Sequence, residues 1–515
     1  MKNFIRMTAF ALSLLMLAAC SPAEKPQTDA ADTTAAVAET TVAEETLDPT
    51  LRANHFDSIP ETVRFNGETI TCLFDGTDEY ISGISQMYMF NDLLGTDNIG
   101  DAVSDAVYQR NLTTQERLNI KLVWKPSGSS AYQENRPIFQ QLFMSQDASF
   151  DFILATGSTT AYVGYGQYMR DIMNIPHVDW ESPWWWQKVN SDLSLDNKTR
   201  QFVIGDMLLT NLAQCSVTYF NKNMYQDIYG DPNDLYNLTL DGKFTVDKLH
   251  ELAAGAYKDV NGDGAKDPED RFGIVWTQGA TSELYGMVVA LGAKTYSRGE
   301  DGFIKIDMNH ERNITIVEKL TALIHDTTAV SRQNLSVRNI ANAFTEDKML
   351  FSINALTYTS NVLREMESEY GILPRPKLDE AQEMYFTNVP NSGNMLSVPA
   401  YLPDNKFEIV GATLEVLNGE AHRTYMDVFW EMTIKAKYSR DAESGKCVDL
   451  IMAGLTKDVL NEYTNYNTGI IARCLVNPCV NQVDFASKYA ESIEAANLNW
   501  NAALATLTGA NKESK

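Results

Sequence analysis

Short apolar runs alternate with amphipathic stretches over the first part of the chain. The runs at Glu68–Phe74, Ile120–Trp124 and Phe150–Ala155 have the length and residue types of strands. The stretches at Ala102–Leu118 and Ile138–Met144 between them carry apolar residues at helical spacing. The order strand, helix, strand, helix, strand predicts an α/β lobe with a parallel sheet.

The same alternation returns further along the chain. Thr245–Lys258 and Asn313–Ile324 have helical periodicity, whereas Phe272–Trp276 and Met349–Ile353 are strand-like. After Pro374-Arg375-Pro376 the pattern is mostly helical. We therefore expect two α/β lobes followed by a helical C-terminal part.

These expectations divide the chain into five regions. Residues 1–19 and 20–62 precede the globular pattern, 63–213 form lobe 1, and 214–387 form lobe 2. Residues 388–515 hold a crossover and C-terminal helices that pack on both lobes, and part of this region completes lobe 1.

The first twenty residues have the layout of a secretory signal. Lys2 and Arg6 precede an apolar run at Met7–Leu17, which is too short for a comfortable membrane span. The tetrad Leu17-Ala18-Ala19-Cys20 resembles the lipobox of bacterial lipoproteins. That resemblance implies cleavage after residue 19, lipidation of Cys20 and an outward-facing membrane anchor. The alternative is a plain signal peptide with a chance cysteine.

Residues 21–50 are rich in Ala, Thr, Glu and Asp and contain no aromatic residue. Such a stretch cannot bury enough apolar surface to offset the entropy lost on ordering. We predict a disordered acidic tether over residues 20–62.

Charge and cysteine content narrow the function further. The net charge of −26 argues against nucleic acid as a partner, because phosphate binding needs clustered Lys and Arg. Five cysteines remain once Cys20 is set aside, so at least one has no partner within the chain. Cys474 and Cys479 are the one close pair, and they form either a local disulfide or two buried thiols.

Several motifs together resemble the family 1 extracellular solute-binding proteins, the group that includes maltose-binding protein. The resemblance covers nearly all of residues 66–500, and Phe244 departs from it because Trp is more usual there. It is carried by Pro183-Trp184-Trp185-Trp186, Ile204-Gly205-Asp206, Val217-Thr218-Tyr219-Phe220-Asn221-Lys222, Asp241-Gly242-Lys243-Phe244-Thr245, Glu346-Asp347-Lys348-Met349-Leu350-Phe351, Tyr370-Gly371-Ile372-Leu373-Pro374-Arg375-Pro376-Lys377 and Arg440-Asp441-Ala442-Glu443-Ser444.

The resemblance implies a periplasmic-binding-protein-like fold of two α/β lobes, joined by a hinge, with the ligand in the cleft between them. Closure of the hinge on the ligand would then be recognised by the transmembrane permease of an ABC importer. It implies a monomeric receptor with a carbohydrate ligand, an oligosaccharide by preference, and no organic cofactor.

A sugar site needs aromatic planes for stacking and amides or carboxylates for hydrogen bonding. Thr156-Gly157-Ser158-Thr159 follows a strand and matches a ligand-contacting loop of the family by position; an ordinary turn with a Ser/Thr cap is the alternative. Gln214 falls where relatives place a polar contact. In lobe 2, Trp276, Gln278 and Tyr358 are candidates, with core packing as the alternative for the aromatics.

Trp184, Trp185 and Trp186 cannot all face one way on a regular element. They either wedge the helices of lobe 1 together or offer a stacking surface, which makes Trp184 and Trp185 candidate ligand contacts.

The stretch at residues 259–270 has the spacing of a calcium loop, with Gly264 at the sharp turn. Two features depart from an EF-hand, because the last position is Asp instead of Glu and a strand follows. The alternative is a solvated turn rich in Asx residues. We expect a structural Ca²⁺ or a similar hard cation, with oxygen ligands from Asp259, Asn261, Asp263, the Ala265 carbonyl, Asp267 and Asp270.

The sequence offers no strong catalytic motif. It contains no HExxH, no GxSxG and no GxxxxGK[ST], and its six His residues lack short metal-ligand spacing. We therefore expect a receptor without catalytic activity. A lipid-anchored glycan hydrolase and a carbohydrate-binding adhesin without transport are the alternatives.

Overall fold

The structure, a computed structural model, describes residues 48, 51–77, 92–95, 102–129, 131–163, 168–363, 366–429 and 442–507. The predicted signal peptide, the lipidation site at Cys20 and the predicted tether as far as residue 47 lie outside the described residues. So do Arg440 and Asp441 of the last family motif.

The first sheet has four strands in the order β12 (Asn394–Ser397), β3 (Phe152–Thr156), β1 (Glu68–Phe74) and β2 (Ile120–Pro126). β1 runs parallel to β2 and β3, with Cys72 opposite both Trp124 and Phe152. β12 pairs antiparallel with β3. The predicted strands of this sheet are confirmed, and β12, from beyond residue 388, completes the sheet.

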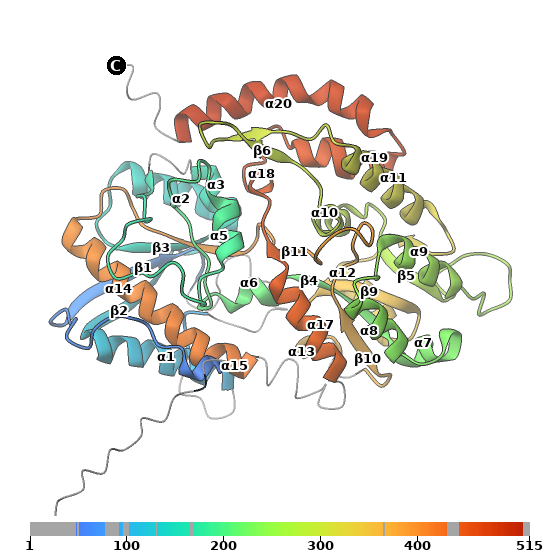
Figure 1. Cartoon of the computed structure of the whole chain (residues 1–515), viewed down its shortest axis with the longest axis horizontal. Coiled ribbons are helices and arrows are strands. Elements are labelled where there is room, and N and C mark those ends of the chain that lie inside the picture. The colour runs from blue at the N-terminus through green and yellow to red at the C-terminus, as the bar shows by residue number, and fades with distance from the viewer. Residues whose placement is uncertain are drawn as a thin grey trace, which may run out of the picture. The chain divides into compact units, whose positions relative to one another are not determined.

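The second sheet has five strands in the order β10 (Tyr370–Leu373), β4 (Ser216–Asn221), β9 (Met349–Ala355), β5 (Phe272–Thr277) and β8 (Val330–Gln333). β5 is parallel to β8 and β9, whereas β4 is antiparallel to β9 and β10. Figure 1 shows the two sheets apart from each other, the first on the left and the second on the right. The mixed α/β architecture is therefore confirmed.

The chain crosses between the sheets more than once. It passes from the first sheet to the second through α6 (Leu209–Ala213) and directly into β4, and it returns from β10 to β12 through residues 374–393. Within this return, β11 (Thr387–Asn388) pairs with β13 (Leu455–Thr456), so the C-terminal region is tied to the crossover.

Helices cover both sheets, and their starts follow from local chemistry. Asn221 accepts a hydrogen bond from the Met224 backbone at the start of α7, and Thr245 accepts one from Lys248 at the start of α9. The predicted helices are confirmed to within a few residues. The helices that precede residue 374 are α1 (Ala102–Leu118), α2 (Tyr132–Met144), α3 (Gly157–Val163), α5 (Gln187–Leu193), α7 (Lys222–Tyr229), α8 (Asn233–Leu240), α9 (Val246–Gly255), α10 (Thr281–Ala290), α11 (Glu311–His325), α12 (Val337–Thr345) and α13 (Tyr358–Asn361).

The C-terminal part is largely helical, as predicted. Almost every residue of α14 from Phe407 onward is buried, so this helix is central to the first lobe. No helix among the described residues is long and apolar enough to cross a membrane. The C-terminal helices are α14 (Asp404–Glu420), α15 (Met426–Phe429), α17 (Ala442–Ala453), α18 (Val459–Glu462), α19 (Asn477–Asn481) and α20 (Phe485–Leu507), with short π-helical segments at Ala421–Tyr425 and Ala472–Val476.

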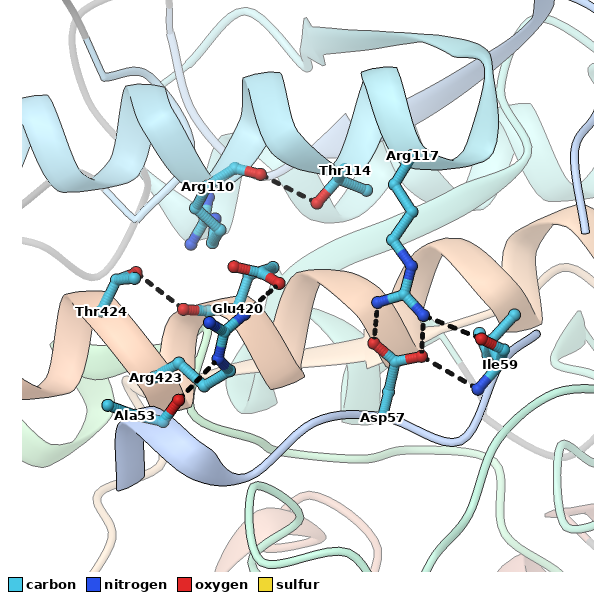
Figure 2. A network of polar contacts seen from close by, with 9 residues as sticks. All are labelled: Ala53, Asp57, Ile59, Arg110, Thr114, Arg117, Glu420, Arg423 and Thr424. Atoms are coloured by element: carbon cyan, nitrogen blue, oxygen red, sulfur yellow. Dashed lines mark hydrogen bonds and ion pairs between the residues drawn. The ribbon is translucent and has the colours of Figure 1, made fainter. Parts of the chain in front are cut away.

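The described end of the predicted tether packs on the first lobe. Asp57 forms an ion pair with Arg117 of α1, and Arg117 also donates to the Ile59 carbonyl at 2.9 Å (Figure 2). The Ile59 side chain is buried in the core, and His55 lies 2.9 Å from a ring nitrogen of His422. Residues 51–62 therefore belong to the folded body, which corrects the predicted boundary at residue 62. The sequence of this segment has no periodic apolar pattern, and a few specific contacts hold it on the lobe instead.

The five cysteines among the described residues are all buried free thiols. Burial raises the pKa of Cys474 to about 11 and that of Cys479 to about 12. The local disulfide is not formed, and the alternative of two buried thiols is the observed one.

Candidate functional site

A pocket of about 710 Å³ lies where the chain crosses between the sheets. Gln214 and Ser216 reach it from the first crossover, and Arg375 reaches it from the second. The remaining walls come from α10, from β11 and the segment after it, and from α18 with the loop after it. They are lined by Thr281, Tyr285, Gly286, Asn388, Pro390, Asn391, Ser392, Asn461, Thr464 and Gly469.

Two amide side chains of the lining hold unused hydrogen-bonding groups. The Gln214 Oε1 accepts a hydrogen bond of 2.8 Å from the Ser392 hydroxyl, but Gln214 Nε2 has no partner among the described residues. Asn388 Oδ1 is likewise buried without a partner there. Because an unpaired buried polar group carries a desolvation cost, a ligand with hydroxyl groups would bind these atoms favourably.

Arg375 is the charged residue of the lining. Its side chain is buried, and Nη1 donates to the Glu283 carbonyl at 3.1 Å. Burial lowers the pKa of Arg375 to about 10, so the guanidinium is still charged near neutral pH. Gly286 of α10 admits this approach, because a Cβ there would lie 2.2 Å from Arg375 Nη1.

A buried ion pair supports the wall behind the pocket. Lys457 Nζ lies 2.9 Å from Glu462 Oε1, and both side chains are 1% exposed. The same ammonium donates to the Pro390 carbonyl at 2.9 Å, which fixes part of the lining. Burial raises the pKa of Glu462, and the Lys457 charge opposes that shift.

The predicted loop at residues 156–159 lies directly behind this wall. The Gly157 and Ser158 backbone N–H groups donate to the carbonyls of Gly393 and Asn391. A Cβ at Gly157 would lie 1.9 Å from Glu462 Oε2, so the close approach requires glycine.

The two threonines of that loop form hydrogen bonds with a buried carboxylate of the first lobe. Thr159 Oγ1 donates to Asp75 Oδ2 at 2.6 Å, Thr156 Oγ1 donates to the same oxygen at 3.1 Å, and all three residues are buried. Burial raises the pKa of Asp75, and these hydrogen bonds oppose the shift. The loop thus supports the pocket, and none of its four residues lines it.

The other predicted contacts fall in different places. Gln214 lines the pocket. Trp276 and Tyr358 are buried in the core, and Gln278 is exposed beside a separate cavity with His325 and Arg332. These three residues are not brought together with Gln214.

The three consecutive tryptophans are buried in the first lobe. Trp185 Nε1 donates to Glu415 Oε2 of α14 at 2.9 Å, and Trp186 Nε1 donates to Asp206 Oδ1 at 2.7 Å. Trp184 is 2% exposed. The burial of Trp184 and Trp185 favours the packing interpretation over a stacking surface, because no ring face is open to a ligand.

The Asp-rich loop is closed by hydrogen bonds to its own backbone. Asp259 accepts from Gly262 and Gly264, both at positive φ, and Asp263 accepts from Ala265. Asp270 accepts from Val260 and from the Tyr257 hydroxyl. Among the described residues, no three His, Cys, Asp or Glu side chains are grouped as a metal site would need. The calcium site, including Asn261 and Asp267, stays a prediction.

Sequence reasoning missed most of the lining. Asn388, Asn391 and Ser392 lie in Asn388-Val389-Pro390-Asn391-Ser392-Gly393, the last part of the second crossover. Its run of Asn, Ser, Pro and Gly after the Pro374-Arg375-Pro376 motif is the signal that points to it. Asn461 comes from α18 and Thr464 from the loop after it, more than sixty residues further on, and nothing in the pattern links them to the crossover.

No family model and no curated protein sequence matches the chain. Solved structures do. An ABC substrate-binding protein of Listeria monocytogenes in complex with cycloalternan has 12% identity and a TM-score of 0.52, over 84% of this chain and 99% of that one. The cyclic alpha-maltosyl-1,6-maltose binding protein of Arthrobacter globiformis has 12% identity and a TM-score of 0.52, over 85% and 99%.

A third structure, an uncharacterized protein of Listeria monocytogenes EGD-e, has 11% identity and a TM-score of 0.53, over 84% of this chain and 98% of that one. The chain has the two-lobed fold of the solute-binding proteins. At these identities the likeness concerns the fold. The 710 Å³ pocket lies against the segments by which this chain crosses between its two sheets.

Proposed function

We propose that the chain is the ligand-binding receptor of an ABC importer and that it binds a carbohydrate in the pocket at the crossovers. The observation that carries the proposal is the lining itself. It joins segments of both crossovers and presents two buried amide atoms, Gln214 Nε2 and Asn388 Oδ1, that have no hydrogen-bond partner among the described residues. Groups of this kind suit a ligand surrounded by hydroxyls.

The neighbouring structures support the same ligand class. The Listeria protein is in complex with cycloalternan, and the Arthrobacter protein is named for the cyclic maltosyl-maltose that it binds. A carbohydrate that enters the pocket would be enclosed by movement of the lobes about the crossovers, which is how this fold converts binding into a signal for a permease.

The location of the receptor follows from the N-terminus. We infer that the chain is exported, lipidated at Cys20 and held as a monomer on the outer side of a membrane, where it delivers its ligand to the permease. The tether then comprises residues 20 to about 50, because residues 51–62 pack on the body. We further infer that the protein has no catalytic activity.

The test is a melting-temperature screen of the purified full chain against neutral and acidic mono- and oligosaccharides. A ligand that binds only the folded state stabilises it by about 2.7 kcal/mol at about a hundredfold excess over its dissociation constant. We expect a shift with one class of glycan and no release of reducing sugar. Turnover of the glycan would favour the hydrolase, and the absence of a shift with every carbohydrate would contradict the proposal.

A further inference from the structure

The pocket at the crossovers has a charge opposite to that of the chain. The chain contains 68 acidic and 42 basic residues, yet no Asp or Glu lines the pocket within the described residues, and Arg375 does. The local charge of the pocket is therefore positive in a protein whose net charge is −26.

Arg375 also lacks the partner that a buried cation normally has. Its side chain is 4% exposed, and within the described residues it forms no ion pair with a carboxylate. The negative charge of Glu283 opposes the lowering of the Arg375 pKa, and its carboxylate accepts hydrogen bonds from the Thr277 N–H and hydroxyl at 3.3 and 3.2 Å. A guanidinium presents five N–H donors, and one contact with a backbone carbonyl leaves most of them for a ligand.

The rest of the lining suits a polar ligand better than a long neutral glycan. Tyr285 is the one aromatic residue of the lining within the described residues, so extended stacking on sugar faces is not provided there. Gln214 Nε2 is a second buried donor without a partner in the described part of the chain.

We propose that this pocket binds a sugar with an anionic substituent, a carboxylate or a phosphate, and that Arg375 pairs with the anion. The planar fork of a guanidinium matches the oxygen pairs of both groups, and such charge-assisted bonds are stronger than neutral ones. Gln214 and Asn388 then bind the hydroxyls of the sugar. The proposal rests on the function proposed above and specifies the ligand class.

Matched pairs of ligands test the proposal on the unaltered full chain. Galacturonate and digalacturonate are compared with their methyl esters, and glucose 6-phosphate is compared with glucose, by isothermal titration. We expect the acid of at least one pair to bind about tenfold tighter or better than its neutral partner. The uronate pairs and the phosphate pair show which anion is recognised.

Two variants assign the effect to the pocket. Arg375→Gln is expected to lower affinity for the acid about tenfold more than it lowers affinity for the neutral partner. Gln214→Glu adds a negative charge to the same pocket without altering Arg375, and it should also weaken acid binding. Arg332→Gln, which removes a cation beside the separate cavity, is the matched control.

The outcomes separate the two proposals. Neutral sugars that bind as tightly as their acids would overturn the anionic ligand and leave the carbohydrate receptor standing. Binding of inorganic phosphate or acetate without binding of any sugar would overturn the carbohydrate receptor itself. Equal loss of affinity for the acid in Arg332→Gln and Arg375→Gln would overturn the role of Arg375.

Discussion

Replacing Lys457 by Met tests whether the buried ion pair holds the wall of the pocket. Lys457 and Glu462 are each 1% exposed and 2.9 Å apart. At an effective dielectric of about 20, two unit charges at that distance attract by about 6 kcal/mol, and the cost of desolvating both groups offsets much of this. Without Lys457, the Glu462 carboxylate stays buried and unpaired, for which the cost is about 3–5 kcal/mol. Lys457→Met should lower the free energy of unfolding by that amount.

The assay is urea unfolding of the full chain, for Lys457→Met, Glu462→Gln and the double variant. The double variant should recover most of the loss, because it removes both charges. It should not recover the hydrogen bond to the Pro390 carbonyl, so ligand affinity should stay reduced. A loss below about 1 kcal/mol in Lys457→Met, or strict additivity in the double variant, would show that the ion pair does not stabilise this wall.

The pH dependence of Lys457→Met gives a second check. Burial already raises the pKa of Glu462, and loss of the cation raises it further. A carboxyl group whose pKa is higher in the folded state than in the unfolded state destabilises the fold as the pH rises. The loss begins near the pKa of the unfolded state, about 4.3, and is complete above the pKa of the folded state. The destabilisation of Lys457→Met should therefore shrink as the pH is lowered towards the unfolded value.

Three further predictions concern other parts of the molecule. Burial raises the pKa of Glu415 to about 7, so the folded state loses stability as the pH rises from about 4.5 to 7. Glu415→Gln should remove this pH dependence of the free energy of unfolding, measured with urea, and an unchanged pH profile would contradict the prediction. Asp57→Asn should lower the free energy of unfolding by about 1–2 kcal/mol, because Arg117 loses an ion-pair partner whose side chain is 3% exposed. An unchanged free energy of unfolding would indicate that residues 51–62 belong to the tether. Calcium should raise the melting temperature, a chelator should reverse this rise, and Asp259→Asn should abolish it. The absence of a shift in the parent protein would favour the alternative of a solvated Asx-rich turn without metal.

The arrangement of strands and helices could be predicted from the sequence, whereas the lining of the pocket could not. The strands at Glu68–Phe74 and Met349–Ala355 stand out because each is a short run rich in apolar residues. Gln214 and Asn461 line the same pocket because the chain returns to it through β13 and α18. No local sequence pattern predicts this return. Gly157 shows the difference well. Its position after a strand indicates the right region, yet only the packed Glu462 carboxylate reveals that it supports the wall.

Buried tryptophans and the N-terminal segment were harder to predict for a related reason. Trp184 and Trp185 have the composition of a sugar-stacking surface, and their role depends on whether α14 covers them. Residues 51–62 have no periodic pattern, and single contacts such as Asp57 with Arg117 hold them. In both cases long-range contacts decide the outcome.

The most direct test of the central claim is the affinity of the full chain for a carbohydrate identified by the glycan screen, measured by isothermal titration for Gln214→Ala and Gln278→Ala. Gln214 lines the pocket at the crossovers, and Gln278 is exposed beside a separate cavity. We predict that Gln214→Ala weakens binding about fivefold to tenfold and that Gln278→Ala leaves it unchanged. Equal affinity in Gln214→Ala and the parent, or a loss confined to Gln278→Ala, would contradict the account.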